Sequence, residues 1–351
     1  MTGRRMPAEW EPHRATWIAW PYLESDFPGK LDAVRWAFCE LIRHVSKVER
    51  VEILCKDESL ERDLRHRLTR QKIEGDIRVH RAEYNRSWLR DSGPIGVRGD
   101  TPEWVSYHFT GWGALPEVEL DQGVPAFIAS ATGIPLRRGE YRKETPVLEG
   151  GMLDVSGDGL AMVTAECLLS ETQQRNRGFT KHDYQEIFSR DLGVADTIWL
   201  PWGVSGDDTH GHIDNVARFI GPRVVVVASA EKSDSEQYEK LQENIAVLRA
   251  YRCPRGESLM VVELPFPEPR YCDGTRWAAG YLNFYFANDM LLVPTYNDPK
   301  DRLVLGTLGD LLPDRQVIGI HCGDWILGGG TLHCSTQQEP TWNSIRQSES
   351  R

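Results

Sequence analysis

The sequence predicts an α/β fold in which five units of similar build close into a ring around one central pocket. Three observations lead to this prediction. Helical and strand-like stretches alternate from the N-terminus onward, hairpin patterns recur about every 60 residues, and polar residues suited to catalysis precede the hairpins. With 351 residues, 40% of them hydrophobic, the chain can bury a core large enough for such an assembly.

The N-terminal part of the chain alternates between strands and helices. A strand at residues 17–20 precedes residues 31–48, whose apolar side chains follow the i, i+3, i+4, i+7 spacing of an amphipathic helix. A buried strand is predicted over residues 51–55, a charged helix over 57–72 and another strand over 77–80. This order is typical of an α/β protein.

Four later segments have turn residues between strand-like runs, as in β-hairpins. In chain order, the turns fall at Gly99, Gly157, Gly221 and Asn288. Between and after them, helices are predicted over residues 123–132, 180–192, 235–251 and 299–312, and strands over 198–200, 259–262 and 317–320. Each unit therefore has the order hairpin, helix, strand. The first strand and the C-terminal glycine turn would supply a fifth unit and close the ring.

Polar residues mark equivalent positions in the successive units. In chain order they are Asp91, Glu149, His212 with Asp214, Asn283 and Cys334. If the units surround an axis, these residues meet there. Three consecutive glycines just before Cys334 allow a positive φ or a close approach of the backbone to another group. We therefore expect one pocket that combines a thiol, an imidazole and several carboxylates.

Such a pocket suits a guanidinium group, which is cationic and planar. Its carbon resists attack, so an enzyme must hold the cation with carboxylates and present a thiolate. Asp91 and Asp214 are the candidates for the clamp, and Cys334 is the candidate nucleophile. His212 would carry protons while Glu149 orients its ring. We expect His212 and Asp214 on one face of a strand, and His333 on the face opposite Cys334.

Each of these residues also has a simpler interpretation. Cys334 could be a small buried hydrophobe, Asp91 a turn former and Glu149 a solvated surface group. Trp88 and Trp112 could serve packing alone. His210, His212 and Asp214 could hold a metal, because two histidines separated by one residue lie on the same face of a strand, although no further Cys or His cluster completes the site. The joint placement of the polar residues favours the catalytic interpretation.

Composition limits the classes of partner and compartment. The formal net charge of -11 argues against binding to nucleic acid or to an anionic membrane, and it is compatible with a cationic ligand. Seven cysteines without a CxxC pair indicate a reducing compartment. The sequence contains no signal-like or membrane-spanning apolar run. We expect a cytoplasmic protein.

An ordered set of motifs resembles the agmatine deiminase family, which also includes bacterial-type peptidylarginine deiminases. The matching segments are residues 9–13, 16–21, 88–94, 111–113, 149–151, 206–214, 281–285 and 328–338. The family belongs to the guanidino-group-modifying superfamily, so the resemblance implies the pentein fold, a pseudo-symmetric five-bladed α/β propeller. The sequence departs from the family pattern at Asp208, His210, Thr331 and Ser335.

The resemblance implies hydrolysis of a guanidine to a urea with release of ammonia. Cys334 would form a covalent amidino intermediate, His212 would act as acid and base, and Asp91, Asp214 and Glu149 would complete the catalytic set. The candidates for substrate binding are Trp88, Asp208, Trp112 and Gly330. Neither a metal nor an organic cofactor is expected.

These inferences predict one α/β domain over residues 1–351 with a flexible tail from about residue 341. The predicted enzyme converts agmatine to N-carbamoylputrescine and ammonia. One alternative is a deiminase of another guanidine, such as free or peptidyl arginine. A second alternative is a non-catalytic propeller that binds a cationic ligand. A small cationic guanidine is the expected partner, and the sequence leaves open whether the chain forms a homo-oligomer.

Overall fold

The computed structural model describes residues 3–254 and 256–342. The fold is mixed α/β. Within these residues the strands form six separate sheets, five of three or four strands and one two-stranded hairpin, β13–β14 (Arg270–Cys272 and Thr275–Trp277). None of the six described sheets closes on itself. The alternation of helices and strands predicted from the sequence is confirmed, whereas the closed ring stays a prediction.

Four sheets share one topology, in which an antiparallel hairpin is followed by a strand parallel to its second arm. They are β4–β5–β6 (Ile95–Val97, Glu103–Ser106, Leu136–Arg138), β7–β8–β9 (Asp154–Val155, Leu160–Thr164, Asp196–Leu200), β10–β11–β12 (Ala217–Gly221, Val224–Ser229, Met260–Pro265) and β15–β16–β17 (Tyr285–Ala287, Met290–Thr295, Gln316–His321). A parallel pair needs a crossover connection, and helices lie in each of these connections.

The fifth sheet brings the two ends of the described chain together. Strand β1 (His13–Ala19) pairs antiparallel with β18 (Thr336–Pro340) and parallel with β2 (Arg50–Cys55), which pairs with β3 (Ile77–Arg81). The two ends of the chain thus replace the hairpin of the other sheets. This pairing is the one expected from the first strand and the C-terminal glycine turn.

The long helices lie where the sequence predicts them, and their bounds are α1 (Leu31–Val45), α2 (Glu58–Arg70), α4 (Val124–Thr132), α6 (Lys181–Leu192), α7 (Ser235–Ala250) and α8 (Pro299–Leu311). Local chemistry fixes several of these ends. Asp57 caps α2 and Thr180 caps α6 through side-chain oxygens, and Gly193 ends α6 at φ +71°. Helix α1 ends at Val45, three residues earlier than predicted.

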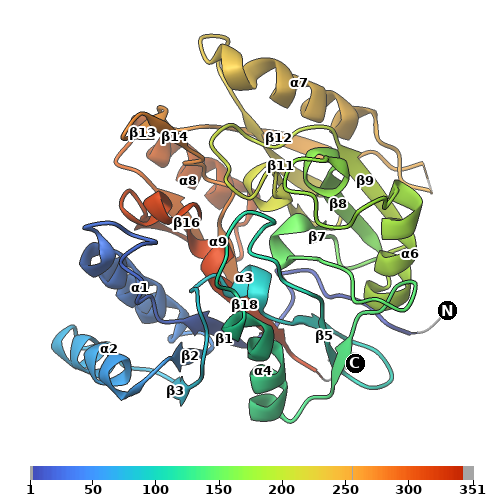
Figure 1. Ribbon diagram of the computed structural model, residues 1–351. Helices are drawn as coiled ribbons and strands as arrows, with labels where there is room; N and C mark the ends of the chain where they lie inside the picture. The colour runs from blue at the N-terminus through green and yellow to red at the C-terminus, as the bar shows by residue number, and fades with distance from the viewer. Residues whose placement is uncertain (1–2, 255, 343–351) are drawn as a thin grey trace, which may run out of the picture.

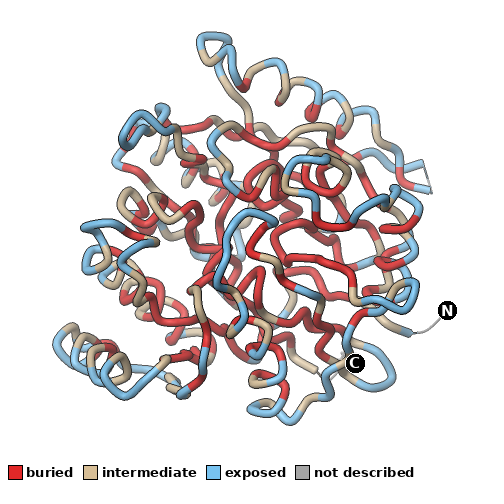
Figure 2. The backbone as a smooth tube through the Cα atoms, viewed as in Figure 1, coloured by how far each residue is buried: buried red, intermediate tan, exposed pale blue. Residues whose placement is uncertain are grey.

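Two short helices occupy the centre of the molecule. Figure 1 shows α3 (Leu89–Ser92) and α9 (Leu332–Ser335) near the middle of the view, with α2, α4, α6 and α7 toward the periphery. In Figure 2 most backbone in the central region is buried, although one exposed loop crosses the view there, and exposed backbone follows the outer helices. The chemically active segments therefore lie in the interior, where water is scarce.

Several elements were not predicted from the sequence. Strand β6 is the arginine-rich Leu136–Arg138, which lacks apolar alternation, and α5 (Ala165–Leu169) is too short to show helical periodicity. The predicted tail begins at Thr341 and Trp342, which contact Pro12 and Trp104, and its remainder lies outside the described residues. No helix in the described part of the chain is long and apolar enough to cross a membrane.

Candidate active site

Short helical turns bring the five predicted catalytic residues together. Asp91 lies in α3, Glu149 immediately precedes the 3-10 turn η2 (Gly150–Met152), His212 precedes η3 (Ile213–Asn215), Asp214 lies in η3 and Cys334 lies in α9. All five side chains are buried. Contacts join Glu149, His212 and Asp91 into one group and Asp214 and Cys334 into another, and Asp91 and Cys334 line the same cavity.

The predicted substrate-binding residues lie around one small cavity. Its lining consists of Trp88, Asp91, Trp112, Asp208, Thr209, Gly328, Gly329, Gly330 and Cys334. Asp208 is exposed at this cavity, whereas both tryptophans are buried. The lining thus includes both an exposed carboxylate, that of Asp208, and the buried thiol of Cys334.

His212 is held from one side and left free on the other. Its Nε2 lies 3.1 Å from Oε2 of Glu149, while its Nδ1 is 3.9 Å from Oδ1 of Asp91 and has no hydrogen-bond partner. Burial alone would lower the pKa of His212, but the charge of Asp91 and the hydrogen bond to Glu149 outweigh it and raise this pKa to about 9. A buried ring nitrogen beside the cavity is therefore available to a bound ligand.

Asp91 is fixed by two donors. Its Oδ2 accepts from Nε1 of Trp112 at 2.9 Å and its Oδ1 accepts from the backbone N–H of Gly151 at 3.0 Å. Burial raises the pKa of Asp91 to about 6 against the lowering effect of the nearby charge of His212. Each oxygen keeps a second lone pair, so Asp91 can still accept from a cation in the cavity.

Asp214 is held by His333 and leaves one oxygen unused. Its Oδ2 accepts from Nδ1 of His333 at 2.8 Å and lies 3.6 Å from the thiol of Cys334, whereas its Oδ1 is buried without a partner. Burial raises the pKa of Asp214, but the hydrogen bond and charge of His333 more than offset this, so its pKa lies below the usual value. The carboxylate form is therefore favoured.

Two sequence expectations about this region were wrong. His212 and Asp214 do not lie on a strand, because η3 winds the chain into a 3-10 turn directly after His212. His333 does not point away from the site, because residues 332–335 are helical rather than extended. Helical winding lets His333 reach Asp214 on one side and Oε2 of Glu9, at 2.6 Å, on the other.

Asn283 organises the turn that carries Cys334. Its Oδ1 accepts from the backbone N–H groups of Thr331, His333 and Cys334 at 3.1–3.3 Å, and its Nδ2 donates to Sγ of Cys334 at 3.1 Å. Burial, together with the charges of Asp214 and Asp91, raises the pKa of the thiol well above its usual value. The thiol is therefore protonated while the cavity holds no cation.

The glycine turn is needed for space. Gly329 has φ +95°, and a side chain there would overlap the carboxylate of Asp208. A Cβ on Gly330 would lie 2.9 Å from Sγ of Cys334 and 3.2 Å from the ring of Trp88. Both roles expected for these glycines, a positive φ and a close approach, are present.

The segment between β9 and η3 is shaped by Asp207. Its carboxylate accepts from the backbone N–H groups of Thr209, Gly211 and His212, each at 3.0 Å. His210, at φ +63°, turns toward Ser170 at 3.1 Å while His212 turns toward Glu149. The two histidines therefore do not form the metal site considered as an alternative.

The sequence analysis gave no role to Arg175, Asp207 or Glu9. Each acts on a predicted residue by hydrogen bonds: Arg175 on Glu149, Asp207 on His212, and Glu9 on His333. Asp207 and Glu9 lie inside motifs that were noticed, so their motifs were the available signal. Arg175 lies in a polar loop with no pattern that could have singled it out.

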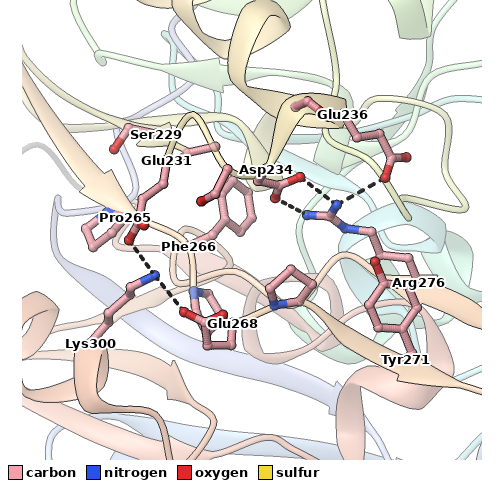
Figure 3. Close-up of a pocket in the computed structure, with 15 residues that line it drawn as sticks. Ser229, Glu231, Asp234, Glu236, Pro265, Phe266, Glu268, Tyr271, Arg276 and Lys300 are labelled. Atoms are coloured by element: carbon pink, nitrogen blue, oxygen red, sulfur yellow. Dashed lines mark hydrogen bonds and ion pairs between the residues drawn. The ribbon is translucent and has the colours of Figure 1, made fainter.

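A second and larger cavity, of about 470 Å³, lies at the surface near the start of α7 and the end of β12 (Figure 3). None of the predicted site residues lines it. Its cations are already paired, Lys300 with Glu231 and Glu268, and Arg276 with Asp234 and Glu236. The buried constellation around Cys334 is the stronger candidate for an active site.

Comparisons with known proteins identify the family of this chain. The family model described as Porphyromonas-type peptidyl-arginine deiminase matches residues 5–340. An agmatine deiminase of Pseudomonas aeruginosa strain LESB58 is 32% identical, and the alignment covers 96% of each chain. These matches confirm the family predicted from the sequence motifs.

Solved structures give the same result. An agmatine deiminase of C. jejuni, a cysteine-to-serine variant with substrate bound, superposes with a TM-score of 0.86 at 27% identity over 97% of each chain. The agmatine deiminase of Enterococcus faecalis superposes with a TM-score of 0.86 at 29% identity over 96% of each chain. Because the family model matches residues 5–340 and the Pseudomonas aeruginosa enzyme is 32% identical, the chain belongs to the Porphyromonas-type peptidyl-arginine deiminase family.

Proposed function

We propose that this enzyme hydrolyses the guanidino group of agmatine to give N-carbamoylputrescine and ammonia. The observation that carries the proposal is a pair of buried atoms without partners, Oδ1 of Asp214 and Nδ1 of His212. The other oxygen of Asp214 lies 3.6 Å from Sγ of Cys334, and Nδ1 of His212 lies 3.9 Å from Asp91, which lines the same cavity as Cys334. Unpaired buried polar atoms are costly, so their presence indicates a ligand that pairs with them. The relatives named agmatine deiminase support the choice of substrate.

A guanidinium matches this arrangement by charge and shape. Its N–H groups can donate to Asp214 and Asp91, and carboxylates on two sides would hold the planar group with its carbon facing Cys334. Trp88 and Trp112 would pack against the cation, since they line the cavity. Asp208, exposed at the cavity, would meet the amino group at the other end of agmatine.

The cation would also activate the nucleophile. The carboxylates of Asp214 and Asp91 raise the pKa of Cys334, and Asp91 and Glu149 raise the pKa of His212. A bound guanidinium offsets these negative charges, so both pKa values fall when substrate binds. His212 can then take the thiol proton, and Nδ2 of Asn283 donates to the sulfur.

The reaction is a double displacement. The sulfur of Cys334 forms a bond to the guanidino carbon, and His212 passes the thiol proton to the leaving nitrogen, which departs as ammonia. The amidino group is then bonded to sulfur. His212 then removes a proton from a water molecule, and the oxygen of this water adds to the same carbon. The C–S bond breaks, and the thiol and a urea are released. Glu149 keeps the imidazole oriented throughout.

Two finer statements about the fold belong to the same proposal. The five sheets of similar strand order would be the blades of a five-bladed propeller of the pentein type, with the active site at its centre. The whole chain would be one domain. The pairing of β1 with β18 supports both statements because it ties the two ends of the described chain into one sheet.

A substrate panel tests the function directly. The purified enzyme is offered agmatine, free arginine, a peptidyl arginine and a methylated arginine, and ammonia and ureido product are both measured. We expect the highest kcat/KM for agmatine. Preference for an arginine substrate would support the alternative deiminase. No ammonia from any guanidine would contradict the proposed function and favour a ligand-binding protein.

A further inference from the structure

The loop between α5 and α6 holds two residues, Gln173 and Arg175, that lie beside the candidate active site. The side chain of Arg175 has no exposed surface, whereas Arg177, two residues further on, is exposed. Burying a guanidinium is unfavourable unless acceptors surround it. The hydrogen-bond acceptors around Arg175 therefore show which parts of the site this side chain links.

Arg175 connects the acid–base pair to the wall of the cavity. Its Nε lies 3.2 Å from Oε2 and 3.3 Å from Oε1 of Glu149, the residue that holds His212. Its Nη2 donates to the carbonyl oxygen of Thr209 at 2.7 Å, and its Nη1 donates to that of Gln173 at 2.8 Å. Only the rigid fork of an arginine can serve these three partners at once.

Gln173 connects two walls of the cavity to each other. Its Nε2 donates to the carbonyl oxygens of Trp112, at 3.0 Å, and Asp208, at 2.9 Å. Its own backbone has φ +47°, and a Cβ on Gly113 would lie 2.9 Å from its carbonyl oxygen. Trp112 has φ +60°. This uncommon backbone geometry, next to an active site, indicates a conformation that the surrounding contacts impose.

We propose that Arg175 is a positioning residue for the Glu149–His212 pair and that Gln173 is a positioning residue for the cavity walls formed by Trp112 and Asp208. This inference rests on the proposed function, because it assigns the two residues to different steps of that reaction. Neither side chain lines the cavity, so both act through the residues that they hold.

The two roles have different kinetic consequences. Loss of Arg175 disturbs proton transfer, which lowers kcat, whereas loss of Gln173 loosens substrate binding, which raises KM. Loss of Arg175 also removes the cation that competes with His212 for Glu149, so His212 should titrate at higher pH. The other charged or titratable groups near this pair are Asp91, Asp207, Asp208, Asp214, Cys167 and Tyr184. None of these groups is changed in the variants.

The experiment compares Arg175→Gln, Arg175→Lys and Gln173→Ala with the wild type and with the matched control Arg177→Gln. The kinetic constants kcat and KM for agmatine are measured across pH. The titration of His212 is followed by NMR in the substrate-free protein, with its signal assigned by its absence from His212→Gln. Thermal unfolding reports any loss of stability.

We expect Arg175→Gln to lower kcat by about 10- to 100-fold and to move the His212 titration upward. Arg175→Lys keeps the charge but not the fork, so kcat should fall while the titration stays near that of the wild type. Gln173→Ala should raise KM about tenfold without moving the titration. Arg177→Gln should behave as the wild type.

An Arg175→Gln enzyme that unfolds more easily but keeps the wild-type kcat and His212 titration would overturn the inference, because Arg175 would then be a structural ion pair only. If Arg175→Gln does not fold, wild-type kcat in Arg175→Lys together with wild-type KM in Gln173→Ala has the same consequence. Failure of the proposed function is a separate outcome, namely no ammonia from any guanidine. The substrate-free titration still tests Arg175 in that case.

Discussion

Gly151 shows, at the scale of single residues, that the active site depends on small residues as well as on charged ones. Its backbone N–H donates to Asp91, and a Cβ at this position would overlap Nδ1 of His212 and lie 3.0 Å from Oδ1 of Asp91. The absence of a side chain at Gly151 therefore leaves room for both His212, the candidate acid–base residue, and Asp91, a candidate ligand of the guanidinium. The sequence marked this position only as part of a double glycine.

Gly151→Ala should therefore abolish activity without unfolding the protein. The added methyl group displaces His212 or Asp91, and misplacement by about 1 Å can cost a hundredfold in rate. We expect kcat to fall at least about a hundredfold while the unfolding midpoint changes little. The control is Gly306→Ala in α8, where no atom lies within 4 Å of the new Cβ. That variant should keep full activity and gain about 0.4–1 kcal/mol of stability.

Cys334→Ala should yield no ureido product from any guanidine, because the variant has no sulfur to bond to the guanidino carbon. The measurement is product formation at high enzyme concentration, with circular dichroism to confirm folding. Cys272→Ala is the matched control, since Cys272 is exposed on the β13–β14 hairpin. Undiminished turnover in Cys334→Ala would disprove the covalent mechanism.

Binding of a guanidinium should weaken in acid because of Asp91. Its pKa of about 6 means that the carboxylate is present above that pH and is neutralised below it. In the inactive Cys334→Ser variant, the Kd of an alkylguanidine without a second charge should rise by up to about tenfold per pH unit below 6. Calorimetry measures this directly. A Kd that stays constant from pH 7 to about pH 5 would contradict a clamp that includes Asp91.

At the scale of elements, regular segments could be predicted and the central turns could not. The helix α6 has a capping threonine, an apolar stripe and a terminal glycine, and each is a local signal. The turns η3 and α9 span three and four residues, too few for periodicity. Contacts from distant residues such as Asn283 shape α9 instead. The direction of His333 was therefore wrongly predicted although its neighbour Cys334 was correctly placed in the pocket.

The loop from Asp207 to His212 gives a prediction at the same scale. Asp207→Ala removes the acceptor of three backbone N–H groups, including that of His212. The expected loss is about 1–2 kcal/mol in the free energy of unfolding, with a fall in kcat because His212 is no longer held. Urea denaturation and steady-state kinetics measure the two effects. Asp207→Asn keeps one acceptor oxygen and should be intermediate, and equal stability of all three proteins would contradict the role of Asp207.

At the scale of the whole molecule, the N-terminal segment makes contacts that join the repeated units. The sequence repeat predicts only the order of these units along the chain. The repeat predicts which strands and helices belong together, because spacing along the chain is visible. It does not predict which residues outside the repeat reach the centre. Glu9 is such a residue: its carboxylate reaches Arg218 in β10, the backbone N–H of Phe286 in β15 and His333 in α9. The motif at residues 9–13 marks Glu9, but nothing in that motif indicates these contacts.

Glu9→Gln should destabilise the entire protein. Arg218 and His333 are buried, and removal of a partner from a buried charged group typically costs about 3–5 kcal/mol. Burial would raise the pKa of Glu9, but Arg218 and His333 hold it well below 4.5. The wild-type carboxylate therefore contributes stability above that pH, and this contribution is lost as the pH falls through the folded-state pKa.

Urea denaturation at several pH values measures both the loss of stability in Glu9→Gln and its dependence on pH. The difference between wild type and Glu9→Gln should be largest near neutrality and shrink in acid, while the exposed control Glu119→Gln should match the wild type throughout. A Glu9→Gln protein as stable as the wild type at neutral pH would show that the N-terminal segment does not hold the units together.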